Sequence, residues 1–263
     1  MTPHDEYPRP PGAEPWWADA WEIDFVADSG VAGFVRLTLL PAQGVAWWWT
    51  SLLTPRLVAV RDHEVPLPRT GLEVRADGLW GELVCETPLE HWSIGLEAFG
   101  VAYDNPADAW GDEWGERLPV GLDLEWEAIG GPGVFSPAGP RPGPDGVAYS
   151  HAGRVHGEVL VGPDRLPVSG LGFRSRASGV LDWWTGGPYR RLAWAKPDQV
   201  TVVESHDENA PDALVLREEP VTVLGEAPML VTAPGRQAVR LARAVCQIGG
   251  DDGGTGWAEW FPA

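Results

Sequence analysis

Residues 120–127 read Val-Gly-Leu-Asp-Leu-Glu-Trp-Glu, and this stretch decides the class of fold. Large apolar residues stand at every second position, and acidic residues fill most of the positions between them. An alternation with a period of two places one set of side chains on each face of a β-strand. The stretch therefore predicts a strand with one dry face and one wet face.

Segments of the same kind recur on both sides of this strand. Before it, the alternation predicts strands at 31–40, 56–60, 71–75, 79–86 and 92–101. After it, strands are predicted at 153–161, 166–173, 178–184, 190–195, 200–204, 213–217, 221–224, 229–232, 237–248 and 256–261. Short strands separated by turn signals are typical of antiparallel sandwiches and barrels, so we expect an all-β protein. The best helix candidate is 106–116, with Asn105 as its cap.

A Gly- and Pro-rich stretch separates the two series of strands. Residues 130–146 read GGPGVFSPAGPRPGPDG, and no apolar period survives across them. A chain of 263 residues is long enough for one large or two small domains. We therefore expect two β domains in tandem, at 14–140 and 141–263.

Composition excludes several classes of partner. The chain has 38 acidic and 19 basic residues, a formal charge of −19, which disfavours nucleic acids and anionic membrane surfaces. No run approaches the roughly 20 apolar residues of a membrane span, and residues 1–15 form a polar, Pro-rich arm without a signal pattern. We expect a cytoplasmic protein with a loose arm. Cys85 and Cys246 are expected as free thiols, one disulfide being the alternative.

Cofactor and metal motifs are missing from the sequence. There is no Cys-x-x-Cys pair, His-Glu-x-x-His, Walker loop, dinucleotide fingerprint or Gly-x-Ser-x-Gly. We therefore expect no cofactor and no metal, and we disfavour kinases, nucleotide-dependent dehydrogenases and the common serine hydrolases.

Tryptophan is the unusual residue, with 16 copies that occur largely in pairs and triplets. In a strand, Trp47 and Trp49 share one face and Trp48 takes the other, so both faces of that strand are expected to be covered, one by a barrel interior and one by the second domain. Rigid aromatic walls suit a pocket for an apolar ligand; the alternative is that the rings fill core and interface. A carboxyl group among indole rings is desolvated, which raises its pKa and makes it a candidate general acid.

The chain resembles the lipocalin-like carotenoid 1,2-hydratase (hydroxyneurosporene synthase) superfamily, which also includes fungal lipocalin-like Diels–Alderases. The resemblance rests on GLW (78–80), PLEHWSIGLEA (88–98), PVGLDLEWE (119–127), Tyr149, GRVHGEV (153–159), GLGFR (170–174) and GWAEW (256–260). It implies two tandem lipocalin- or calycin-like antiparallel β domains with few short helices and an associated ligand pocket. It also implies chemistry without an organic cofactor, either hydration of terpenoid alkenes or Diels–Alder closure of polyenes.

One motif departs from the pattern of that superfamily. Its members commonly carry Arg-Asp-His-Ser-Trp-Gly-x-Arg-Asp-Trp, where residues 174–183 here read RSRASGVLDW. Arg176 replaces the His, and a guanidinium stays protonated near neutral pH, so it supplies no acid. Arg176 either holds a carboxylate, enolate or carbonyl of a substrate or pairs with Asp182. For Arg174 we expect simple pairing with Asp182.

These features favour a cofactor-independent cyclase or isomerase that acts on an apolar polyene or terpenoid biosynthetic intermediate in a Trp-lined pocket. The alternatives are an alkene hydratase or dehydratase of a terpenoid and a non-catalytic carrier of an apolar ligand. The expected partner is an apolar small molecule, without nucleic acid or membrane insertion, and the expected state is a monomer or homodimer. The candidate catalytic residues are Asp182, Arg176, His91, Glu97 and Tyr149. The candidate substrate-binding residues are Trp47, Trp49, Trp80, Trp92, Trp126, Arg174, Trp183, Trp184, Trp194 and Trp257.

Overall fold

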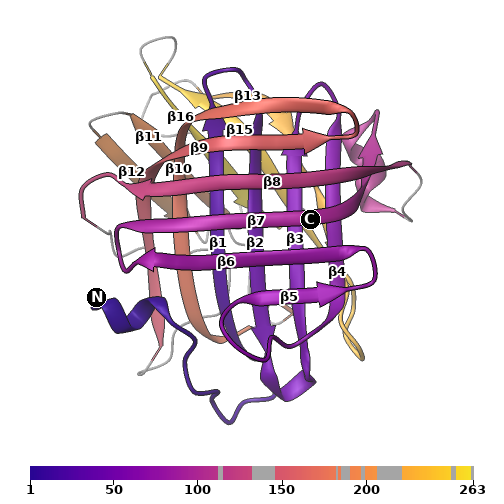
Figure 1. Cartoon of the computed structure of the whole chain (residues 1–263), viewed down its shortest axis with the longest axis vertical. Helices are drawn as coiled ribbons and strands as arrows, with labels where there is room; N and C mark the ends of the chain where they lie inside the picture. The colour runs from indigo at the N-terminus through magenta and orange to yellow at the C-terminus, as the bar shows by residue number, and fades with distance from the viewer. Residues whose placement is uncertain are drawn as a thin grey trace.

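The computed structural model describes residues 1–111, 115–131, 146–181, 183–184, 190–196, 199–205, 221–249 and 253–261. Within these residues the chain forms strands β1 to β16 and the short 3-10 helices η1 (Pro3–Glu6), η2 (Pro41–Gln43) and η3 (Pro106–Trp110). The predicted all-β class with few short helices is therefore confirmed (Figure 1).

The larger sheet has ten antiparallel strands in the order β4-β3-β2-β1-β10-β9-β8-β7-β6-β5. They are β1 (Trp17–Ala27), β2 (Ala32–Leu40), β3 (Val45–Leu53), β4 (Leu57–Pro66), β5 (Glu73–Ala76), β6 (Leu79–Thr87), β7 (His91–Tyr103), β8 (Glu116–Ala128), β9 (Val147–Val161) and β10 (Asp164–Val180). The sheet closes on itself because β4 also pairs with β7, from Leu57↔Tyr103 to Ala59↔Val101. Strands β1 to β4 cross behind β5 to β8, as in an orthogonal β-barrel (Figure 1).

Alternating side chains fill the interior of this barrel. The 120–127 stretch lies in β8, where Leu122, Leu124 and Trp126 are buried in the barrel core and Asp123 is exposed. Trp21 and Trp48 reach the same core from β1 and β3. The predicted dry and wet faces of this stretch are confirmed.

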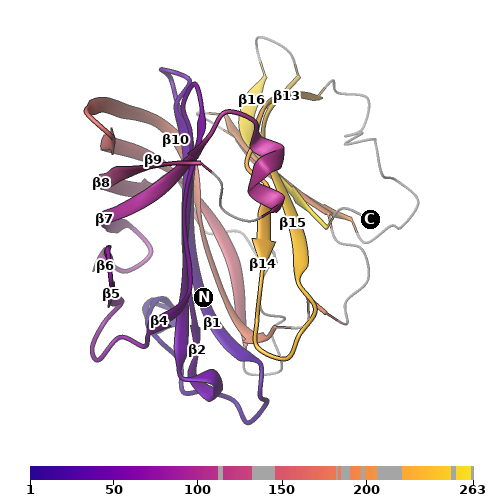
Figure 2. The same cartoon turned by 90° about the vertical axis from the view of Figure 1, so that its right-hand side faces the viewer.

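A second sheet covers the outer face of β1 to β3 (Figure 2). In the described residues it consists of β11 (Arg190–Lys196), β12 (Gln199–Ser205), β13 (Val221–Glu226), β15 (Val239–Ile248) and β16 (Gly254–Trp260), with β14 (Met229–Val231) paired to β15. Trp47 and Trp49 pack into this interface and Trp48 faces the barrel core, so the predicted split of the three rings is confirmed.

Buried ion pairs also join the two layers. Glu22 on β1 accepts two hydrogen bonds from Arg243 on β15, at 2.7 and 3.0 Å, and one from Arg36 on β2, at 3.3 Å. Arg243 also lies 3.4 Å from a carboxylate oxygen of Glu259 on β16. All four residues are buried, so removal of one partner would leave an uncompensated charge between the sheets.

The expected boundary at residue 140 falls inside the larger sheet. Strand β9 pairs with β8 and β10 pairs with β1, so both belong to the barrel. The sheets divide between β10 and β11, and the Gly- and Pro-rich stretch connects two neighbouring antiparallel strands, Ala128↔Gly153 being paired on either side of it. A hairpin connection and a linker between domains have the same local composition, so composition alone does not distinguish them.

Two smaller expectations concern local structure. Helix η3 begins at Pro106 with the Asn105 side chain accepting from the amide of Ala107 at 3.2 Å, but it ends at Trp110, and residues 112–114 lie outside the described part. The prediction of free thiols at Cys85 and Cys246 is confirmed. No helix among the described residues is long and apolar enough to span a membrane.

His63 on β4 lies where the barrel meets the second layer. Its Nε2 accepts a hydrogen bond from Trp49 at 2.9 Å, and its Nδ1 lies 3.4 Å from the hydroxyl of Thr232, which follows β14. Burial, and secondarily the charge of Arg61, lowers the pKa of His63 to about 4. Folding therefore requires a neutral imidazole at pH values where the unfolded chain is protonated.

We predict that His63 makes the protein less stable in mild acid. Because the unfolded state binds the proton first, stability falls as the pH drops from about 6.5 towards 4, by about 2 kcal/mol between pH 7 and pH 5. Urea unfolding of the wild type and His63→Gln at both pH values measures the difference. The exposed His156→Gln serves as the control, and equal pH dependence in all three proteins would contradict the prediction.

Candidate functional site

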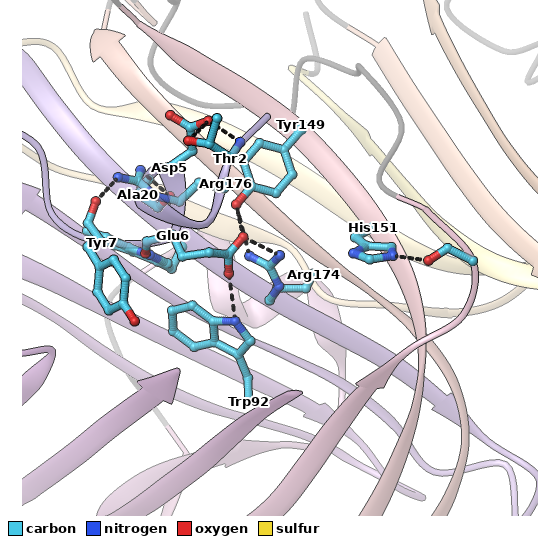
Figure 3. Close-up of polar contacts among 12 residues, drawn as sticks. Thr2, Asp5, Glu6, Tyr7, Ala20, Trp92, Tyr149, His151, Arg174 and Arg176 are labelled. Atoms are coloured by element: carbon cyan, nitrogen blue, oxygen red, sulfur yellow. Dashed lines mark hydrogen bonds and ion pairs between the residues drawn. The ribbon is translucent and has the colours of Figure 1, made fainter. Parts of the chain in front are cut away.

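The segment before β1 enters the barrel mouth and carries a buried carboxylate. Helix η1 follows Thr2, whose amide donates to the Asp5 carboxylate at 2.7 Å in a capping box. The helix presents Glu6 to the interior, where its side chain is fully buried (Figure 3). The arm expected to be loose is thus docked at this point.

Three donors converge on the Glu6 carboxylate (Figure 3). One oxygen accepts from Arg174 Nη2 on β10 at 2.8 Å and from the phenol of Tyr149 on β9. The other accepts from the indole Nε1 of Trp92 on β7 at 2.8 Å. Both oxygens are therefore paired within the barrel, with a charge-assisted bond from the guanidinium.

Aromatic rings surround the guanidinium of Arg174. Its central carbon lies 5.2 Å from the ring centroid of Trp92, 5.1 Å from that of Trp126 and 5.3 Å from that of Tyr149. Such distances allow cation–π attraction, which is strongest in a desolvated place. We call Arg174, Trp92, Trp126 and Tyr149 the Arg174 cage.

A second buried ion pair holds the backbone of the same segment. Arg176 pairs with Asp19 on β1, and its guanidinium lies 3.9 Å from the ring centroid of Trp21. Arg176 Nη2 donates to the carbonyl of Tyr7 at 3.1 Å, and the indole of Trp21 donates to the carbonyl of Glu6 at 3.0 Å. The Asp19 carboxylate accepts from the Arg9 amide at 2.8 Å, so residues 6–9 are bound by barrel side chains.

Burial sets the protonation behaviour around the cage. It raises the pKa of Tyr149, and the neighbouring Glu6 carboxylate acts in the same direction, so the phenol stays protonated and donates. It also raises the pKa of Asp19, with Arg176 acting in the opposite direction. His151, whose ring stacks edge-on against Trp126 at 5.2 Å, has its pKa lowered by burial.

The chemistry of the cage follows from its donors. A guanidinium, a phenol and an indole N–H directed at one point suit a carboxylate, an enolate or a carbonyl oxygen. Fixed donors in a water-excluded place stabilise negative charge that develops on such an oxygen during a reaction. Among the described residues, no group of three or more His, Cys, Asp or Glu side chains has the arrangement of a metal site.

The structure brings together five of the candidate residues, namely Arg174, Arg176, Tyr149, Trp92 and Trp126. Arg174 pairs with Glu6, and Arg176 pairs with Asp19. The expected pairing of Arg174 with Asp182 involves a residue outside the described part of the chain. Asp182 and the side chain of Trp194 lie outside the described residues.

The remaining candidates lie elsewhere. Trp47, Trp49, Trp183 and Trp257 are packed between the two layers, Trp183 stacking on Trp49 with a centroid distance of 5.6 Å. Trp184 packs against Trp16, with ring centroids 4.7 Å apart, and donates to the carbonyl of Gln237 at 2.9 Å.

Three candidates lie on β6 and β7 away from the cage. His91 is half-buried and lies 2.6 Å from Glu125. Trp80 and the exposed Glu97 line an outer groove of about 530 Å³ beside Phe99.

The sequence reading missed Glu6, Asp19 and Trp21. Strand β1, which carries two of them, was not predicted, although Trp21, Ile23 and Phe25 alternate along it. That alternation is the signal that would have found the strand. Nothing in the polar arm singles out Glu6 from its neighbours.

The closed barrel, the covering sheet and the cage in the mouth define a lipocalin-like all-β protein, as the resemblance implied. The chain belongs to the family of the domain of unknown function DUF7064, whose match spans residues 2–213. No curated protein matches its sequence.

Solved structures with a similar fold share little sequence with this chain. A putative AttH protein from Nitrosomonas europaea has a TM-score of 0.52 and 10% identity, over 94% of this chain and 92% of that one. CghA has a TM-score of 0.46 and 12% identity, over 94% and 88%. Kievitone hydratase from Nectria haematococca has a TM-score of 0.42 and 11% identity, over 94% and 89%. At these identities the likeness concerns the fold.

We predict that Arg176 and Asp19 are strongly coupled in stability. Arg176→Met leaves a buried carboxylate without its cation and should cost about 3–5 kcal/mol of unfolding free energy. Asp19→Asn keeps an acceptor for the Arg9 amide and removes the charge, so the double variant should cost less than the sum of the single ones.

Urea unfolding of the four proteins gives this coupling energy. The exposed pair Arg165 and Glu158, with Arg165→Met and Glu158→Gln, is the matched control on neighbouring strands and should show a much smaller coupling. Additive effects at Arg176 and Asp19 would show that their contact does not stabilise the fold.

Proposed function

We propose that this protein is a cofactor-independent cyclase or isomerase that acts on an apolar polyene or terpenoid, with the Arg174 cage as its reaction centre. The observation that carries the proposal is the convergence of Arg174, Tyr149 and Trp92 on a single carboxylate position inside aromatic walls. Three fixed donors at one buried point exceed what packing of a barrel requires, and they match the needs of a developing negative charge.

In this reaction a carbonyl or carboxylate oxygen of the substrate takes the place of a Glu6 oxygen. Hydrogen bonds from Arg174 and Tyr149 withdraw electron density from the conjugated system attached to that oxygen. The faces of Trp92 and Trp126 hold the hydrocarbon part in a reactive conformer, which reduces the entropy lost in the ring-closing step. All substrate atoms remain in the product, so no oxidant, reductant or water is consumed.

The contacts of Arg176 bear on the two alternative functions, a hydratase and a carrier. Arg176 stands where the resembled superfamily has a His, and it is bound to Asp19 and to the backbone of Tyr7. A guanidinium held in this way supplies no proton, which weighs against hydration and favours a carrier as the second candidate.

Metabolite profiling tests the proposed reaction. The purified protein is incubated with a small-molecule extract of the organism that encodes it, in normal and in ¹⁸O-labelled water, and the mixture is analysed by liquid chromatography and mass spectrometry. We expect one compound to be consumed and a product of the same mass to form. Tyr149→Phe should slow this conversion about 100-fold, since one oxyanion donor is lost.

Tyr103→Phe provides the control, because it removes the hydroxyl of another buried tyrosine outside the cage and should leave the conversion unchanged. A product that gains one labelled water would identify a hydratase. A ligand bound and recovered unchanged would identify a carrier. Either result, or no conversion at all, would overturn the cyclase or isomerase proposal.

A further inference from the structure

We infer that the Arg174 cage is a binding site for the carboxylate of a flat, apolar ligand, and that Glu6 fills it as an internal substitute which the ligand displaces. The inference rests on the proposed function for the location of the site, but binding can be measured without turnover. Its basis is the way in which residues 2–9 are held in the barrel mouth.

Residues 6–9 are held in the barrel mouth by the kinds of contact that hold a bound ligand. Four groups of residues 6–9 are held by side chains of the strands: the Glu6 carboxylate and carbonyl, the Tyr7 carbonyl and the Arg9 amide. Around Glu6, the segment is largely exposed, including Thr2, His4 and Pro8. A segment that has one buried side chain and is otherwise held by a few contacts of its backbone can leave the mouth without disrupting the strands behind it.

The charges in the mouth select an anion. Asp19 and Arg176 neutralise each other, so departure of Glu6 leaves the guanidinium of Arg174 without its carboxylate. A buried cation of this kind is strongly unfavourable unless an anion replaces the one that left. The vacated site therefore favours a ligand with a single negative group.

The donor geometry specifies a carboxylate. Arg174 and Tyr149 both donate to one oxygen of Glu6, and Trp92 donates to the other. Two oxygens thus accept three hydrogen bonds, which an alcohol cannot reproduce. The rings of Trp92, Trp126 and Tyr149 beside the guanidinium suit an aromatic or conjugated body next to that carboxylate.

Occupation of the cage by Glu6 lowers the apparent affinity of the protein for an external ligand. A ligand binds only the fraction of molecules in which the segment has left, so its apparent dissociation constant rises as that fraction falls. Weakening the hold on Glu6 should therefore tighten binding of an external carboxylate. The test therefore measures whether weaker binding of the Glu6 carboxylate is accompanied by tighter binding of an external carboxylate.

The first experiment fills the site with a small anion. Glu6→Ala retains Cβ, and the atoms it removes correspond to those of acetate. We expect Glu6→Ala to lower the melting temperature by roughly 5–15 °C, and sodium acetate to restore a saturable part of the loss. Acetamide and sodium chloride should not do so, and the exposed Glu14→Ala should respond to none of them. Equal effects of acetate and chloride on Glu6→Ala would overturn the carboxylate site.

The second experiment measures displacement and does not depend on the Ala variant folding. Glu6→Gln keeps the size of the side chain and removes its charge. Calorimetric titration with cinnamate should give binding at least about tenfold tighter than in the wild type, whereas cinnamyl alcohol should not distinguish the two proteins. Equal affinity of both proteins for cinnamate would show that Glu6 does not compete for the site.

The outcomes separate this inference from the proposed reaction. Carboxylate binding without any conversion of an extract compound leaves the inference standing and overturns the reaction. Conversion of a compound, with no preference of the cage for acetate or cinnamate over their neutral analogues, overturns the inference alone.

Discussion

Strands β1, β2 and β10 carry charged side chains into places that water does not reach, and these charges must be neutralised within the fold. The buried residues concerned are Asp19, Glu22, Asp24, Arg36, Arg174 and Arg176. Inside the barrel, Arg176 pairs with Asp19, and Arg174 pairs with Glu6 from the segment before β1. Outside the barrel, Glu22 pairs with Arg243 from β15. Because an unpaired buried charge is so costly, these pairs fix both the segment before β1 and the second sheet on the barrel.

The period of the apolar residues was sufficient to predict the class of fold. It identified the strand at 120–127 and the opposite directions of Trp48 and its two neighbours, since these depend only on the geometry of a single strand. The boundary between sheets could not be found in this way. Whether β9 pairs with β8 is decided by contacts between strands, and the Gly- and Pro-rich residues between them have the same composition in a hairpin and in a linker.

The sequence pointed to the residues of the Arg174 cage as candidates but not to the carboxylate that fills it. Arg174, Tyr149, Trp92 and Trp126 were among the candidate residues because strand patterning and the family resemblance point to them. Glu6 was not, because it lies 168 positions from Arg174 in a four-residue 3-10 helix that has no apolar period. Two charged residues so far apart in the sequence are brought into contact by the closure of the barrel. The sequence alone indicates only that a buried arginine needs some carboxylate opposite it.

The closure of the barrel has a consequence for how it moves. Along one edge, β7 pairs with β6 from His91 to Ala98 and with β4 from Val101 to Tyr103, so the edge forks near Gly100. Only three residue pairs join β4 to β7, whereas nine join β1 to β10. Local opening is easiest where the fewest hydrogen bonds break. The barrel wall therefore has a weak seam here, and the amide hydrogens that join β4 to β7 should exchange with solvent before those that join β1 to β10.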